Sequence, residues 1–122
     1  TRTMMKSKIH RATVSDANLH YVGSITVDTD LLEAADIRPY EQVAIVNINN
    51  GERFETYIFK GKKGSRVIEV NGSAAHLVEP GDRVIIMHFA LMTDREYREN
   101  RPRVLIMDDE NNITETMRYK PS

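Results

Sequence analysis

Two similar stretches decide the fold that this sequence predicts: AADIRPYEQVAIV at residues 34–46 and AAHLVEPGDRVII at residues 74–86. Each contains small residues typical of a helical turn, an apolar residue, a turn with proline, and an apolar run typical of a buried strand. The copies are offset by 40 residues at the alanines and by 41 at the strands, so one residue is inserted between them. Two helix-turn-strand units predict a pseudo-symmetric, closed, small β-barrel.

Strand-like runs dominate the rest of the chain. They are rich in Val, Ile, Thr and Tyr and are bounded by Asn, Gly, Asp or Pro. The predicted strands are residues 8–14, 19–28, 42–48, 53–59, 66–70, 83–91 and 104–107. Between two of them, the segment 49–51 (Asn-Asn-Gly) predicts a tight hairpin with a type I′ turn, because Asn-Gly tolerates positive φ angles.

Helices are predicted to be few and short. Asp28, Thr29 or Asp30 is a suitable N-cap for a helix at residues 31–35, and Thr93 for one at residues 94–99. The predicted fold class is therefore mostly β, with short helices.

Composition limits the classes of protein that this chain fits. Its 122 residues, 40% apolar and 29% charged, match a single soluble domain covering residues 1–122. The net charge of −1, with acids and bases interspersed, argues against a nucleic-acid surface. The absence of cysteine excludes disulfides, thiolate metal sites and a cysteine nucleophile. No apolar run reaches signal-peptide or transmembrane length, so no membrane partner and a cytoplasmic location are expected.

The four histidines do not indicate a metal site. His10, His20, His76 and His88 lack a recognisable ligand spacing. We expect each to be either hydrogen-bonded in the fold or exposed, and no metal cofactor.

The segment HYVGSITVD at residues 20–28 interrupts a strand-like alternation with Gly23-Ser24. A serine hydroxyl held against the preceding carbonyl can convert that amide to an ester. Glycine suits the position because it has no Cβ to block the approach and accepts unusual φ and ψ angles. Taken alone, however, such a dipeptide is more often a bulge or turn glycine followed by a solvent-exposed serine.

Three further segments change this interpretation: KIHR at residues 8–11, NGERFETY at 50–57 and NGSAAH at 71–76. With Gly23-Ser24, in this order and spacing, they resemble the pyruvoyl-dependent L-aspartate 1-decarboxylases, over nearly the whole chain. The resemblance implies a small double-psi β-barrel whose Gly23–Ser24 bond cleaves itself. The products would be a β chain of residues 1–23 and an α chain of residues 24–122, with Ser24 converted to a covalent pyruvoyl cofactor.

The resemblance also implies the reaction and the assembly. L-Aspartate would lose carbon dioxide to give β-alanine through a Schiff base with the pyruvoyl ketone, which acts as the electron sink. β-Alanine supplies pantothenate and hence coenzyme A synthesis. A homotetramer with sites between adjacent subunits is expected, and the need for a maturation helper protein stays open.

Four residues take substrate roles by this resemblance. Arg53 would bind the carboxylate that survives the reaction with its planar fork, and Tyr57 would return a proton to the former α-carbon. Residues four apart on a strand share a face, so both could line one cavity. Thr56 would contact the substrate and support the ester, and the Lys8 ammonium would bind a substrate carboxylate. From the residues alone, a solvent-facing position is the better interpretation for Arg53, and a half-buried packing position for Tyr57.

The segment at residues 71–76 takes the remaining roles. Asn71 would help to position the self-processing bond, and Gly72, Ser73 and Ala74 would contact the substrate. Backbone N–H groups at such a turn can meet a carboxylate or an oxyanion. Ser73 stands where the family usually has alanine, and its added hydroxyl is expected to affect the fine substrate geometry and not the mechanism. From the residues alone, the segment reads as a helix start packed on the barrel.

Two other functions fit a small β-barrel. One is a non-catalytic double-psi barrel used for protein recognition, and the other is a small DNA-binding regulator. Neither needs Gly23-Ser24 together with Arg53, Tyr57 and Asn71, and the second needs a basic face. The sequence favours the enzyme.

Overall fold

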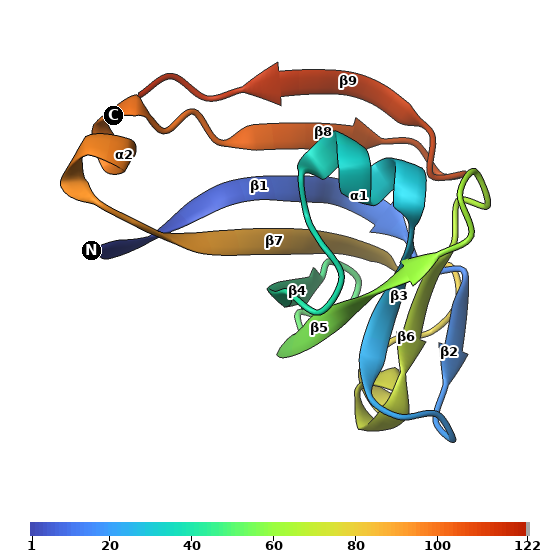
Figure 1. The fold of residues 1–122 in the computed structure, drawn as a ribbon. Coiled ribbons are helices and arrows are strands. Elements are labelled where there is room, and N and C mark those ends of the chain that lie inside the picture. The colour runs from blue at the N-terminus through green and yellow to red at the C-terminus, as the bar shows by residue number, and fades with distance from the viewer. Residues whose placement is uncertain (122) are drawn as a thin grey trace.

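The computed structural model describes residues 1–121, which form a mostly β structure with short helices (Figure 1). The strands are β1 (Arg2–Thr13), β2 (Asp16–Asn18), β3 (Ser24–Asp28), β4 (Gln42–Asn47), β5 (Arg53–Gly61), β6 (Ile68–Asn71), β7 (Arg83–Met92), β8 (Arg103–Met107) and β9 (Ile113–Arg118). The helices are α1 (Thr29–Ala35), the 3-10 helix η1 (Gly72–Leu77) and α2 (Asp94–Glu99). The predicted fold class is confirmed.

All the strands belong to one sheet, in the order β2-β6-β3-β5-β4-β7-β1-β8-β9. The pairs β1–β8, β2–β6 and β3–β5 run parallel and join strands that are distant in sequence, so the chain crosses over instead of meandering. Figure 1 shows β1, β7, β8 and β9 as one long layer, with β3, β5 and β6 running across its end. Both termini and α2 lie at the opposite end of that layer.

The core is built from the inward face of these strands. Its largest fully buried side chains include Ile9, Ile25, Ile45, Ile58, Ile68, Ile86 and Leu105. Full burial of one such side chain contributes about 1.5–3 kcal/mol, so these residues dominate the stabilisation of the barrel.

The two sequence copies pack as a symmetric pair. β4 of the first copy pairs antiparallel with β7 of the second, and Ile45 lies opposite Ile86, its equivalent under the 41-residue offset. Two residues further along each strand, Asn47 and His88 take equivalent buried positions. The predicted pseudo-symmetry is therefore confirmed, with its axis through the Ile45–Ile86 pair.

Both predicted α-helices form, with the expected caps. Asp28 is the residue that caps α1, because its Oδ1 accepts from the Asp30 N–H at 2.8 Å. At α2, Thr93 Oγ1 accepts from the Glu96 N–H while the Glu96 carboxylate accepts from the Thr93 N–H. This reciprocal capping box defines the start of the helix.

Two local predictions are wrong. The strand predicted for residues 19–28 begins only at Ser24, and the loop before it exposes Tyr21 and Val22. The turn at residues 49–51 is not type I′, which requires positive φ at two successive residues. Only Gly51 has positive φ there, and its N–H donates to the Asn47 carbonyl across a wider loop.

Two strands were not predicted. β2 has only three residues, and all six residues of β9 are exposed. Neither strand therefore has the pattern of inward-facing apolar residues by which strands are predicted. Both form because a partner strand, β6 or β8, offers free backbone groups. None of the helices among residues 1–121 is long and apolar enough to cross a membrane.

Candidate active site

Ser24 is the first residue of β3, and its side chain is fully buried. The register of the antiparallel β3–β6 pair places Ser24 opposite Asn71, the last residue of β6. Asn71 Nδ2 donates to Ser24 Oγ at 3.1 Å and lies 3.2 Å from Thr26 Oγ1. The structure thus brings together two predicted self-cleavage residues that are 47 positions apart in the sequence, and excludes the solvent-exposed serine.

Gly23 and Gly72 form a close backbone contact beside Ser24. Gly72 has a φ of +77°, and a Cβ there would lie 2.5 Å from Gly23 Cα and 2.8 Å from Gly23 N. At Gly23, in contrast, φ is not positive and a Cβ would have no neighbour closer than 4.0 Å. In this backbone contact, the crowded position is therefore Gly72.

Asn71 has one unused acceptor. Its Oδ1 is buried and receives no hydrogen bond, although Nδ2 of the same amide is occupied. A buried polar atom without a partner costs about 1–3 kcal/mol, and such groups concentrate where a site performs chemistry. The residues around Ser24 therefore fit a covalent group derived from that serine, since a donor and a free acceptor flank it.

Tyr57 lies beside Ser24 in the parallel β3–β5 pair. Ile25 pairs with Ile58, so the preceding position of β3, Ser24, stands next to Tyr57. The half-buried Tyr57 ring packs edge-on against Phe59, with 5.6 Å between the ring centroids. The Tyr40 ring also packs edge-on against Phe59, with 5.9 Å between the ring centroids. The Tyr40–Phe59 contact was not predicted from the sequence, because nothing local links residue 40 to β5.

Arg53 and Tyr57 share the outer face of β5, as predicted from their spacing. Four residues of strand separate their Cα atoms by roughly 13 Å, however, and Arg53 is exposed. One chain alone does not bring them into one closed cavity. Thr56 alternates to the opposite face of the strand, and its exposed part contributes with Tyr57, Gln42 and Glu55 to a shallow depression.

Lys8 is not near Ser24 within the chain. It lies on β1 between Met87 of β7 and Val104 of β8, and its ammonium stands 5.6 Å from the centre of the Tyr119 ring. In the sheet order, β5, β4 and β7 lie between β3 and β1, so Lys8 is farther from β3 than any other predicted substrate residue.

Ser73 and Ala74 belong to η1, directly after the Gly72 contact. Ser73 is exposed and Ala74 is half-buried against the core. The predicted helical turn forms as a 3-10 helix, and its first residue, Gly72, is in close backbone contact with Gly23. The predicted site residues that lie near Ser24 in one chain are therefore Gly23, Asn71, Gly72 and Tyr57.

Known proteins of one family are similar to this chain over most of its length. The aspartate decarboxylase family model matches residues 1–114. The chain is 59% identical over 110 residues to the aspartate 1-decarboxylase of Caldicellulosiruptor bescii, covering 90% of this chain and 86% of that protein. It is also 59% identical over 113 residues to that of Pelotomaculum thermopropionicum, covering 93% and 86%. The fold is accordingly the family's double-psi β-barrel, and the chain belongs to the aspartate decarboxylase family.

Proposed function

We propose that this chain cleaves its own Gly23–Ser24 bond and then decarboxylates L-aspartate to β-alanine and carbon dioxide. The observation that carries the proposal is the buried Ser24 hydroxyl at the start of β3, held by Asn71 Nδ2 at 3.1 Å. The family uses a serine-derived pyruvoyl group and supplies β-alanine to pantothenate synthesis.

Self-cleavage needs only groups of the chain itself and water. Ser24 Oγ attacks the Gly23 carbonyl carbon, the C–N bond breaks, and the amide becomes an ester with a free Ser24 amine. Loss of the Ser24 α-proton then expels the Gly23 carboxylate, which ends the chain of residues 1–23. Water replaces the nitrogen of the resulting dehydroalanine, ammonia leaves, and residues 24–122 begin with the pyruvoyl group.

Asn71 can assist the transfer of the Gly23 acyl group from the Ser24 nitrogen to Ser24 Oγ, both before and after the ester forms. Nδ2 donates to Ser24 Oγ and so orients the nucleophile while leaving the hydroxyl proton free to depart. Oδ1, which has no partner in the uncleaved chain, is available to accept from the amine that the shift releases. Stabilising the ester in this way favours the direction that leads to cleavage.

The substrate roles that the family resemblance implies fall on residues of β5 and of the start of η1. When formed, the pyruvoyl carbonyl supplies the electron sink for decarboxylation. Arg53 binds the surviving side-chain carboxylate with two parallel N–H donors. Tyr57, next to Ser24 in the sheet, donates a proton to the former α-carbon. Thr56, Gly72, Ser73 and Ala74 complete the contacts with the substrate.

A homotetramer accounts for the residues that lie apart in one chain. Lys8 lies on β1, four strands from β3 in the sheet order, and the exposed Arg53 lies roughly 13 Å along β5 from Tyr57. A neighbouring subunit can use both residues. Sites shared between subunits are a common use of symmetric assembly. We therefore assign Lys8 to the site of an adjacent subunit.

Membership in the aspartate decarboxylase family decides against the alternative of a protein-recognition module. Such a module also has no use for the close Gly23–Gly72 contact or for the buried Ser24–Asn71 hydrogen bond.

Intact mass spectrometry under denaturing conditions tests the proposal, before and after treatment with phenylhydrazine. We expect two fragments, residues 1–23 and 24–122, of which only the larger gains a hydrazone. The Ser24→Ala variant serves as the control and should stay a single, unreactive chain of about 14.0 kDa. A cleaved Ser24→Ala chain would refute the origin of the cofactor. Cleavage that starts only in an extract of the host would show that a helper protein is required.

A further inference from the structure

Each half of the barrel anchors its proline turn with a carboxylate. In the first half, Glu41 Oε2 accepts from the Arg38 N–H at 2.9 Å and lies 2.9 Å from His88 Nε2. In the second half, Asp82 Oδ2 accepts from the Glu79 N–H at 2.9 Å and from Asn47 Nδ2 at 2.8 Å.

These two anchors are equivalent under the pseudo-two-fold axis. Glu41 corresponds to Asp82 and His88 to Asn47, so each turn is tied to the central strand of the other half. The halves differ in one respect that matters chemically: one anchor uses an imidazole and the other an amide.

The first turn also holds the strand that carries Tyr57. The Tyr40 N–H donates to the Ile58 carbonyl at 2.7 Å, and the Ile58 N–H donates to the Glu41 carbonyl at 3.1 Å. Ile58 follows Tyr57 directly and pairs with Ile25 of β3, next to Ser24. In the other half, the same pair of bonds joins the second turn to Val14, the residue directly after β1.

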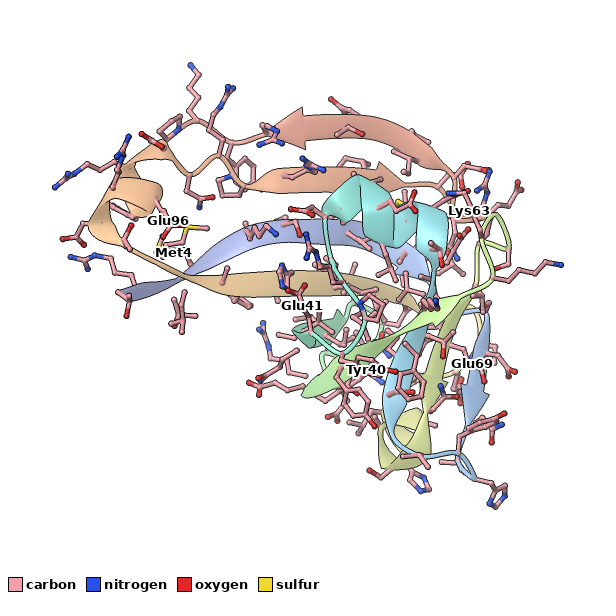
Figure 2. The ribbon with its side chains drawn as sticks, viewed as in Figure 1. Met4, Tyr40, Glu41, Lys63, Glu69 and Glu96 are labelled. Carbon is pink, nitrogen blue, oxygen red and sulfur yellow. The ribbon has the colours of Figure 1, made fainter. Side chains whose placement is uncertain are left out.

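Figure 2 shows Glu41 in the segment between α1 and β4, beside β7, with Tyr40 lower down near β5. His88, on β7, has only 4% of its side chain exposed, whereas Glu41 has 37%. The Glu41–His88 pair therefore joins the partly exposed 38–41 turn to a buried side chain of β7.

We propose that His88 is a positioning residue for Tyr57: by holding Glu41 it fixes the 38–41 turn, and that turn fixes Ile58 and the adjacent proton donor. Because the proposal concerns the step assigned to Tyr57, it rests on the proposed function. A misplacement of about 1 Å at a reacting group can cost on the order of 100-fold in rate, so a distant anchor can matter.

The surroundings of His88 keep its imidazole neutral. Burial lowers the pKa of His88, Glu41 opposes this shift, Lys6 on β1 adds to it, and Asp36 after α1 opposes it. A neutral imidazole that donates through Nε2 leaves Nδ1 as an acceptor, and that atom is buried without a partner. Ser7 pairs with His88 across β1 and β7, and its hydroxyl is likewise buried without a partner.

Two substitutions of His88 separate positioning from packing. His88→Gln places an amide Nε2 at the reach of the imidazole Nε2 and preserves the donor, whereas His88→Leu fills the space without one. We expect His88→Leu to self-cleave and to bind phenylhydrazine, but to lose about tenfold in kcat for L-aspartate with little change in KM. His88→Gln should restore kcat to within about twofold.

Amide hydrogen exchange supplies a readout that does not depend on activity. In His88→Leu, the Ile58 N–H should exchange at least about tenfold faster than in the wild type, while the Val14 N–H of the equivalent turn is unchanged. His88→Gln should retain the protection of Ile58. If the wild type does not decarboxylate L-aspartate, the proposed function fails, and the exchange of Ile58 still decides whether His88 holds this strand.

Matched variants of the two turns provide the control. If His88→Leu does not fold, Glu41→Ala removes the same contact from the partly exposed side. Glu41→Ala should lower kcat and expose the Ile58 amide, and Asp82→Ala should leave kcat within about twofold. Equal losses of kcat in these two variants, or an unchanged kcat and Ile58 exchange in a folded His88→Leu, would overturn the proposal.

Discussion

Gly72 and Gly23 touch through their backbones: a Cβ on Gly72 would lie 2.5 Å from Gly23 Cα, closer than real Cβ atoms come to any neighbour. The contact packs the start of η1 against Gly23, whose carbonyl belongs to the proposed scissile bond. It also separates the roles of the two glycines, since Gly23 has room for a side chain and Gly72 has none.

Gly72→Ala should destabilise the protein by about 3 kcal/mol or more, because it adds a backbone overlap to a φ of +77°. Urea denaturation of the uncleaved Ser24→Ala background measures this without interference from processing. Gly23→Ala is the matched control, and we expect it to unfold within about 0.5 kcal/mol of the parent. Equal destabilisation by both substitutions would contradict the steric assignment.

Asn71→Ala should slow self-cleavage at least about tenfold, because it removes the donor to Ser24 Oγ and the free acceptor Oδ1 together. The fraction of cleaved chain over time, followed by intact mass, gives the rate. Thr26→Val removes only the weaker contact of Asn71 Nδ2, at 3.2 Å, and should cleave within about threefold of the wild-type rate. Normal cleavage of Asn71→Ala would remove this residue from the mechanism.

Lys8→Ala and Tyr57→Phe should each self-cleave yet lose most of the turnover of L-aspartate. If Lys8 acts in the site of an adjacent subunit, co-expression of the two variants should regenerate intact sites. Random mixing of equal amounts predicts about a quarter of the wild-type activity, since each residue must come from the right subunit. Activity no higher than that of the separate variants would place both residues in one chain's site.

Asp28 should make stability sensitive to acid. Burial alone would raise the pKa of Asp28, but the backbone N–H groups of Asp30, Arg66 and Gly64 bind its carboxylate and hold the pKa below its ordinary value. Its stabilisation is therefore present above the unfolded pKa of about 3.8 and is lost as the pH falls through the folded value.

Asp28→Asn should cost about 2 kcal/mol or more at neutral pH, because a neutral amide binds these N–H donors less well. Urea unfolding between pH 3 and 7 measures the effect. The difference between wild type and variant should shrink as the solution is acidified. A difference that is constant over this range would show that the carboxylate charge has no such role.

His88 should produce a second acid-dependent loss, at higher pH. Because its folded pKa is lowered, the unfolded chain binds more protons than the folded one below pH 6.5. The stability contributed by the neutral imidazole is complete above 6.5 and declines as the pH falls through the folded value. His88→Gln cannot titrate, so its stability should vary less between pH 7 and 5 in thermal unfolding. A wild type and His88→Gln with parallel pH profiles would contradict this prediction.

Much of the barrel could be predicted because it depends on local patterns. Alternating apolar residues fix which face of β4, β5 and β7 is buried, and Asp28 and Thr93 cap helices through bonds to residues two or three positions away. The 41-residue repeat predicted a symmetry that Ile45 and Ile86 then realise across one strand pair. The strand prediction was wrong for the residues before Ser24, because their strand-like sequence pattern is also compatible with a loop.

The sequence by itself determined the fold class, the repeat and the residues that resemble the aspartate decarboxylases. Only the tertiary structure decided that Asn71 reaches Ser24, that Gly72 is the crowded glycine, that Lys8 lies away from both, and that His88 holds Glu41. The physical reason is that short-range spacing determines dihedral angles and burial, whereas distant residues meet through strand register and crossover. Those features depend on the packing of the whole core.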